Sequence, residues 1–173
     1  MSFIIRTERL ELIPATLEII TTDLHRRDQL AALLRAEIGA GWPPVLFDVP
    51  AYEYVKRALQ NDPTLGGWTV WYWILRRPRV LIGMSGFKSR PVNGGVELGY
   101  GCLDKYQRRG FASEVVNGMA HWAFANGVER VLAETLPELI ASQRVLAKCG
   151  FRFIGEGSEP GVIRFERRRP ALA

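Results

Sequence analysis

The 173-residue sequence has few cysteines and lacks any long apolar run. Cys102 and Cys149 are its two cysteines, too few for a disulfide framework. No apolar stretch approaches the roughly 20 residues of a membrane-spanning helix. The first residues also lack the basic region and long apolar stretch of a secretory signal. We therefore expect a cytoplasmic protein that does not bind membranes.

Metal-binding spacings and repeats are also missing from the sequence. The two histidines, His25 and His121, stand far apart, and no cysteine, histidine or carboxylate spacing indicates a metal site. No repeat, low-complexity segment or linker divides the chain. Because this length suits one well-buried core, we predict a single domain over residues 1–173.

The composition is that of a globular protein with a basic surface. Hydrophobic residues make up 47% and charged residues 24%. The net charge of +5 and the pI near 9.6 favour anionic partners, and nucleic acid, a ribosome, an acidic peptide or a phosphorylated cofactor all fit. The densest basic run, residues 164–169, is typical of a solvated strand end or tail. Charge alone does not choose among these partners.

Hydrophobic periodicity predicts alternating stretches of strand and helix. Strands are expected at residues 4–13, 68–75, 80–87, 96–103, 130–134, 151–156 and 162–165. Two short helices are expected within 16–36 and single helices over 51–60, 111–125 and 138–149, with a loop over 38–50.

The order of these elements predicts the fold class. A strand–helix–strand unit from 96 to 134 implies a right-handed crossover, so the strands near 96–103 and 130–134 should be parallel. The earlier strands form an antiparallel meander. We therefore predict an α/β (α+β) fold. Its mixed, mostly antiparallel sheet has six to seven strands, one parallel strand pair and helices on both faces.

The helix predicted from residue 111 starts against two local rules. A helix N-terminus is partly positive and favours acidic residues, yet Arg108 and Arg109 precede this one. Gly110 stands where Ser, Thr, Asp or Asn would cap more strongly. Free main-chain N–H groups, the helix dipole and the guanidinium groups would together hold a phosphate or pyrophosphate. The alternative, on the local pattern alone, is a solvent-exposed turn.

Two other glycine-rich segments fail as phosphate-binding motifs. Residues 83–89 look Walker-like, but the glycine spacing is wrong and Phe87 separates Gly86 from Lys88. Residues 99–104 begin like a dinucleotide-binding fingerprint, but Asp104 occupies the third glycine position. Neither segment competes with the loop before residue 111.

That loop, Gln107-Arg108-Arg109-Gly110-Phe111-Ala112, resembles the Gln/Arg-x-x-Gly-x-Gly/Ala motif of the GNAT superfamily of acyl-CoA N-acyltransferases. Thr7-Glu8-Arg9-Leu10, Val96-Glu97-Leu98-Gly99-Tyr100 and the segment from Ser142 to Phe151 match in the same order. Within the superfamily the chain is similar to the ribosomal-protein alanine acetyltransferase branch. The resemblance covers about residues 3 to 168 and implies a GNAT-like fold.

The resemblance implies acetyl-CoA as the acyl donor and no metal. The pyrophosphate would lie on the main-chain amides from Arg108 to Ser113, and the pantetheine arm would run along the preceding strand, where a bulge opens the sheet. The implied cofactor-binding positions are Gly101, Cys102, Leu103, Gln107, Arg108, Arg109, Gly110, Phe111, Ala112, Ser113 and Lys148. A small buried hydrophobe is the preferred interpretation of Cys102, rather than a covalent role.

Two residues are candidates for the chemistry of transfer. Glu97 interrupts an apolar strand and is the candidate base; the alternative is a solvent-facing or ion-paired strand residue. The branch implies Ser142 as the residue that hydrogen-bonds the leaving thiolate; the alternative is a serine on the helix surface. Leu146 stands where many members carry a tyrosine, and Leu139 where the branch usually carries asparagine.

The implied reaction is transfer of an acetyl group to a primary amine by direct attack. The acceptor would be a protein N-terminus or a small-molecule amine, and the loops over 38–50 and 157–162 would border it. Trp42-Pro43-Pro44 in the first loop would gate the substrate or merely staple the loop. The alternative function is a non-catalytic CoA-binding module, or a basic module that docks on RNA or the ribosome. The sequence leaves the oligomeric state open, a homodimer included.

Overall fold

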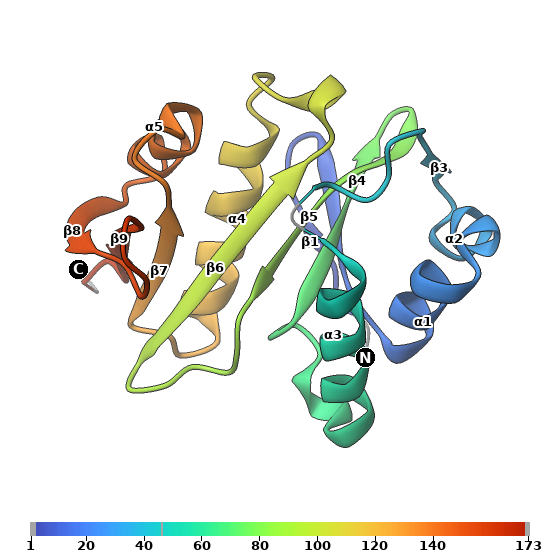
Figure 1. Cartoon of the computed structure of the whole chain (residues 1–173), viewed down its shortest axis with the longest axis horizontal. Coiled ribbons are helices and arrows are strands. Elements are labelled where there is room, and N and C mark those ends of the chain that lie inside the picture. Colours follow the sequence, from blue (N-terminus) through green and yellow to red (C-terminus); the bar gives the residue numbers. More distant parts are fainter. Residues whose placement is uncertain (1–2, 46, 172–173) are drawn as a thin grey trace.

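Nine strands join in one mixed sheet within residues 3–45 and 47–171, the part of the chain that the computed structural model describes (Figure 1). They are β1 (Ile5–Arg6), β2 (Leu10–Pro14), β3 (Glu37–Ile38), β4 (Val70–Arg76), β5 (Arg79–Phe87), β6 (Gly95–Cys102), β7 (Arg130–Thr135), β8 (Arg152–Glu156) and β9 (Ile163–Arg168). The order in the sheet is β1-β2-β4-β5-β6-β7-β9-β8, and β3 pairs with β5 off this path.

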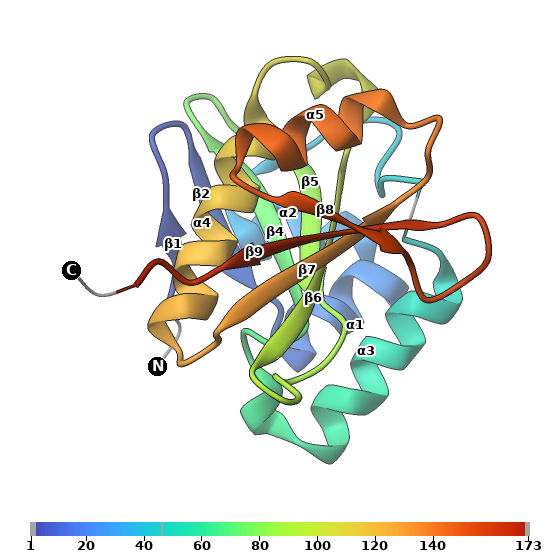
Figure 2. The same ribbon diagram turned by 90° about the vertical axis from the view of Figure 1, so that its left-hand side faces the viewer.

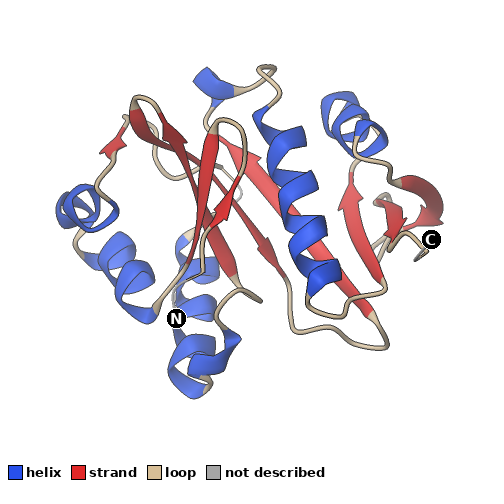
Figure 3. Cartoon of the chain, turned by 180° about the vertical axis from the view of Figure 1, so that it is seen from behind, coloured by secondary structure: helices blue, strands red, loops and turns tan. Residues whose placement is uncertain are grey.

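Within the same described residues, five α-helices cover the two faces of the sheet. They are α1 (Leu17–His25), α2 (Arg27–Leu34), α3 (Val49–Asn61), α4 (Phe111–Ala125) and α5 (Ile140–Lys148). Buried side chains of α1, α2 and α3 form one core cluster, and those of α4 and α5 form the other. Figure 3 shows α4 crossing the sheet, and in Figure 2 α5 lies over the end formed by β7, β9 and β8. The predicted helices on both faces are confirmed.

Two short strands account for the difference from the predicted sheet. The strand predicted over residues 4–13 is a hairpin, because Thr7 closes a turn to Leu10 with N–O and Oγ1–O distances of 3.0 and 3.3 Å. The start of the predicted loop 38–50 also differs, because Ile38 and the preceding Glu37 form β3 and pair in parallel with Leu81 and Val80. The sheet therefore has more strands than predicted and a second, two-residue parallel pairing.

The predicted parallel pair, β6 with β7, opens along its length. Pairing runs from Gly95 with Arg130 to Glu97 with Leu132. Beyond that point β6 pairs with β5 over residues 98–102, whereas residues 133–135 of β7 pair with β9. The two strands converge at one end and separate at the other (Figure 1). The register between β5 and β6 runs without a shift, so this opening comes from diverging strands and not from the predicted bulge.

Aromatic residues of β4 fill both cores. Trp71 and Trp73 face the cluster of α4 and α5, and Tyr72 faces the cluster of α1 to α3, all three fully buried. These three aromatics are therefore core residues. None of the helices in the described part of the chain has the length and apolarity that a membrane span requires.

Candidate active site

The loop before α4 has the backbone of an anion-binding site. Arg108 and Gly110 both take left-handed conformations, with φ of 58° and 82°. Gly110 occupies the N-cap position without a side-chain cap, so the first-turn N–H groups of α4 have no partner within the helix. Gln107 is held in place because its Nε2 donates to Asp104 Oδ1 at 2.8 Å. A row of main-chain N–H groups at a positive helix end suits a pyrophosphate.

An N-terminal clamp that sequence reasoning missed holds this loop. Glu114, in the first turns of α4, accepts hydrogen bonds from Thr7 Oγ1 and from Arg9 N and Nε, the last two at 2.7 and 2.8 Å. Arg9 Nη1 also donates to the Arg109 carbonyl at 2.9 Å, and its guanidinium lies 4.3 Å from the Phe111 ring centroid. The segment Thr7-Glu8-Arg9-Leu10 carried the only signal in the sequence, since Glu114 looked like an ordinary polar-face residue.

The charge state of Glu114 follows from this clamp. Burial raises the pKa of its carboxyl, but the hydrogen bonds from Thr7 and Arg9 outweigh burial and bring the pKa below its usual value. Glu114 is therefore a carboxylate at neutral pH, which keeps the cationic side chain of Arg9 beside the loop.

The end of β6 leads into the same loop. Gly101 and Cys102 are half-buried, while Leu103 is buried in the core of α1 to α3 and its N–H donates to Ile82 O at 2.9 Å. Burial raises the pKa of the Cys102 thiol, and the nearby Asp104 carboxylate raises it further. A neutral, packed thiol is consistent with a small hydrophobe beside the pantetheine path.

Glu97 lies where β6 and β7 separate, as the last β6 residue paired with β7. Its neighbours Val96 and Leu98 point into the core of α4 and α5, so Glu97 projects from the opposite face, as the alternation predicted. The carboxylate forms an ion pair with Lys88. Glu97 is 17% exposed and Lys88 62% exposed at the side chain, so the cation is the more accessible partner.

Ser142 lies on the first turn of α5, on the other side of the sheet from Glu97. Its Oγ is 3.0 Å from the hydroxyl of Tyr100, which comes from β6. Leu146, one helical turn later, is fully buried in the core. Sequence reasoning identified Ser142 and missed Tyr100 as its partner, because the contact joins two elements 42 residues apart.

The two ends of α5 meet different parts of the site. The helix starts at Ile140, two residues later than predicted, and its N-cap Leu139 provides no side-chain cap. Gln143 Nε2 donates to the Pro137 carbonyl at 2.7 Å and ties the helix to the preceding turn. At the other end, Cys149 Sγ donates to Ser113 O at 3.3 Å. The exposed Lys148 is therefore the last residue of a helix that ends beside the first turn of α4.

A cavity of about 380 Å³ lies next to the loop that precedes α4, between residues 39–45 and 102–106. The wall formed by residues 39–45 is anchored by Trp42, which is 7% exposed and donates through Nε1 to Asp23 Oδ1 at 3.0 Å. Trp42 therefore fixes this loop to α1, as the second of its two predicted roles. Asp23 is fully buried, and as a polar residue in a short helix it gave no signal in the sequence. The described residues contain no group of three or more His, Cys, Asp or Glu side chains placed to hold a metal ion.

A mixed sheet that opens between two parallel strands, next to an uncapped helix start, is the architecture of an acyl-CoA-dependent transferase. Residues 9–152 match the family model described as Acetyltransferase (GNAT) domain, so the chain belongs to the GNAT acetyltransferase family. Among curated relatives, YjdG of Bacillus subtilis (strain 168), named as an uncharacterized N-acetyltransferase, is 25% identical over 150 residues. That match covers 86% of this chain and 89% of YjdG.

Solved structures share the fold at low sequence identity. The ribosomal-protein-S5-alanine acetyltransferase of Vibrio fischeri has a TM-score of 0.65 at 21% identity, over 97% of this chain and 96% of that chain. RimL, described as a ribosomal L7/L12 alpha-N-protein acetyltransferase in complex with coenzyme A, has a TM-score of 0.64 at 20% identity, over 96% and 98%. The chain is an acetyl-CoA-dependent N-acetyltransferase.

Proposed function

We propose that this acetyltransferase acetylates the α-amine of a protein or peptide N-terminus, with Glu97 and Ser142 on the two sides of the reacting thioester. The observation that carries the proposal is the opening between β6 and β7. Glu97 lies where the two strands still pair, on one face of the sheet. Ser142 lies on the first turn of α5, which covers the other face.

We place acetyl-CoA on the main-chain groups of the loop before α4 and of β6 that have no partner among the described residues. The pyrophosphate sits on the N–H groups from Arg108 to Ser113, with Arg109 and Lys148 supplying positive charge nearby. The pantetheine arm extends along Gly101 and Cys102 on β6, on the side where residues 98–102 have no partner in β7. This path leads the thioester toward the point where the strands join.

The reaction proceeds by direct attack. The neutral amine nitrogen attacks the thioester carbonyl carbon, the C–N bond forms and the C–S bond breaks, and the sulfur leaves as a thiolate. The nitrogen loses a proton to Glu97, directly or through water, and Ser142 donates a hydrogen bond to the thiolate. Solvent then protonates the thiolate to give free CoA.

The α-amine is the acceptor that best fits this base. A free α-amine has a pKa of about 7.7–8.0 and is substantially neutral near pH 7.5, whereas a lysine amine, at about 10.4, is almost wholly protonated. Because Glu97 is already paired with Lys88, an acceptor that needs little help with deprotonation suits the site. The name of RimL, an alpha-N-protein acetyltransferase, supports the same class.

The test is an acetylation screen with free CoA as the readout. Peptides with free N-termini should be acetylated, and the same peptides with blocked N-termini and free lysines should not. Glu97→Gln should lower kcat at least tenfold and leave the Kd for CoA unchanged, because Glu97 acts on the acceptor side. Equal turnover of the blocked peptides would overturn the acceptor assignment. A CoA-induced rise in melting temperature is expected as well, and no shift at millimolar CoA would overturn the cofactor path.

A further inference from the structure

The phenol of Tyr100 bridges from β6 to the first turn of α5. Its hydroxyl oxygen lies 3.0 Å from Ser142 Oγ and 3.3 Å from the main-chain oxygen of Ser142. One phenol thus reaches both oxygens of the same residue, which restricts the side-chain torsion of Ser142. Ser142 is therefore oriented by the sheet as well as by its own helix.

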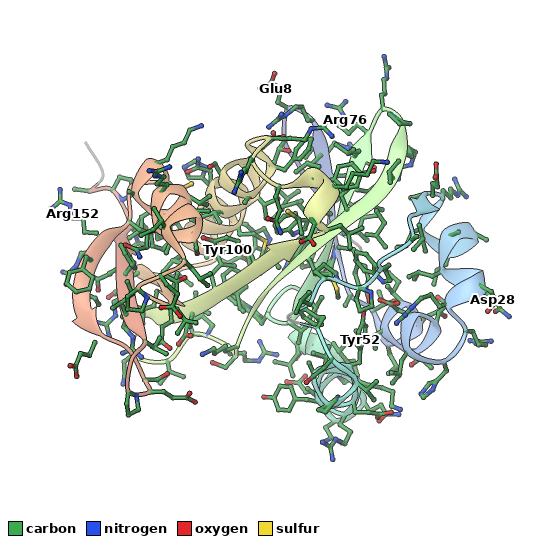
Figure 4. The ribbon with its side chains drawn as sticks, turned by 45° about the horizontal axis from the view of Figure 1, so that its top comes forward. Glu8, Asp28, Tyr52, Arg76, Tyr100 and Arg152 are labelled. Carbon is green, nitrogen blue, oxygen red and sulfur yellow. The ribbon has the colours of Figure 1, made fainter. Side chains whose placement is uncertain are left out.

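Tyr100 is placed beside the opening that the acyl donor enters. It belongs to the part of β6 that pairs with β5, opposite Ser85, beyond the last residue paired with β7. Its ring packs against the core of α4 and α5, and Figure 4 shows it beside α5, away from Tyr52 in the other helical layer. The phenol is thus next to the thioester path and not on the acceptor side.

The phenol is a hydrogen donor over the whole working pH range. Burial raises the pKa of Tyr100 to about 12, although the hydrogen bond with Ser142 acts in the opposite direction. The α5 helix supplies no phenol of its own on this side, since Leu146 occupies the position one turn after Ser142 and is fully buried. Tyr100 is the phenol that meets Ser142.

We propose that Tyr100 is a positioning residue for acetyl transfer. It donates its single hydroxyl hydrogen to the nearer oxygen, Ser142 Oγ at 3.0 Å, rather than to the main-chain oxygen at 3.3 Å, and this leaves the Ser142 hydrogen free to point at the leaving thiolate. Tyr100 loses no proton: the C–S bond breaks, the electron pair stays on sulfur, and the Ser142 hydrogen bond stabilises that charge until solvent protonates it. The inference rests on the role proposed above for Ser142.

A double-mutant cycle of Tyr100→Phe and Ser142→Ala tests this coupling. In the otherwise unchanged enzyme, Tyr100→Phe should lower kcat by about three- to tenfold, the contribution of one hydrogen bond, with KM for acetyl-CoA within about twofold. In the Ser142→Ala background the same substitution should change kcat by less than about twofold. An equal loss in both backgrounds, or no loss in either, would overturn the inference.

Two further measurements keep the result interpretable. Ser85→Ala removes another buried hydroxyl, which accepts a hydrogen bond from Trp73 Nε1 at 2.9 Å in the core of α4 and α5, and should lower the melting temperature but not kcat. If Ser85→Ala lowers kcat as much as Tyr100→Phe does, the Tyr100 effect is structural and the inference fails. A Ser142→Ala variant with full kcat would instead remove the proposed role of Ser142, whatever Tyr100→Phe does.

Discussion

Arg9 Nε lies 2.8 Å from Glu114 Oε2, an ion pair between side chains 105 positions apart in the sequence. The same guanidinium donates to the carbonyl of Arg109 at 2.9 Å. The N-terminal hairpin thereby fixes the loop that precedes α4, so that the main-chain N–H groups of the loop are ordered before any anion arrives. Preorganisation of this kind strengthens binding because less ordering remains to be done on association.

Removing the charge of Glu114 should therefore weaken both the fold and CoA binding. Glu114→Gln replaces charge-assisted hydrogen bonds from Thr7 and Arg9 by neutral ones, and we expect a loss of about 1–2 kcal/mol in the free energy of unfolding. The Kd for CoA should rise several-fold in calorimetric titration. Glu8→Gln is the matched control, since Glu8 projects outward from the same turn (Figure 4) and should change neither quantity. Equal effects of the two substitutions would contradict the clamp.

Gly110 offers a second test of the loop. Its φ of 82° strains any residue with a Cβ, by about 1–2 kcal/mol, and an added Cβ would lie 3.3 Å from Arg9 Nη2. Gly110→Ala should raise the Kd for CoA at least tenfold. Gly127→Ala is the matched control at the other end of α4, with a φ of 88° and open space around it. Gly127→Ala should lower the free energy of unfolding by a similar amount and leave the Kd for CoA unchanged. If Gly127→Ala also raised that Kd, backbone strain alone would explain the effect of Gly110→Ala.

Local sequence signals predicted the elements with strong periodicity. The helix over residues 111–125 has its predicted bounds because an apolar stripe lies between Gly110 and Asn126-Gly127, which mark its ends. The hairpin of β1 and β2 was predicted as one strand because apolar residues alternate on both sides of Thr7. The turn is closed by hydrogen bonds between Leu10 and both the main chain and the hydroxyl of Thr7, which periodicity does not register.

The candidate site was predictable only where it depends on main chain. Loop 107–112 could be identified from its glycine and arginine pattern, since a helix start is a local property. The contacts of Tyr100 with Ser142 and of Arg9 with Glu114 depend on how distant elements pack, and no spacing in the sequence encodes them. Docking on RNA or a ribosome, for which the basic charge is the only indication, stays a prediction.

Asp23 should be essential for stability on the acceptor side. Its buried carboxylate accepts hydrogen bonds from Tyr52 and Tyr72 at 2.6 and 2.9 Å and from Trp42 at 3.0 Å. Asp23→Ala leaves these donors unpaired in the core, and we expect a loss of about 3–5 kcal/mol in the free energy of unfolding. Asp48→Ala, which removes only the exposed cap of α3, should cost about 1 kcal/mol in the same denaturant titration. A loss at Asp23 no larger than the loss at Asp48 would contradict this assignment.

Stability should fall in acid because five carboxyls have lowered pKa values. The three least exposed of them, Glu11, Glu114 and Glu134, should contribute most. A hydrogen bond from Arg79 lowers the pKa of Glu11. Burial raises the pKa of Glu114 and Glu134, but hydrogen bonds outweigh it and the net pKa is lowered at both, at Glu134 through Ser158 and Arg164. A lowered folded-state pKa stabilises the protein above the unfolded value, near 4.5, and that contribution is lost as pH falls through the folded value.

The free energy of unfolding should accordingly be flat near neutrality and fall below about pH 4.5, as denaturant titrations over a pH series would measure. Glu134→Gln removes one of the three groups, so its stability should start lower at neutral pH and depend less steeply on pH in acid. Glu138→Gln, at an exposed position just after β7, should reproduce the unmodified curve. If Glu134→Gln shifts the curve down by the same amount at every pH, the stabilisation at Glu134 does not come from its ionised carboxylate, because only ionisation ties the contribution to this pH range.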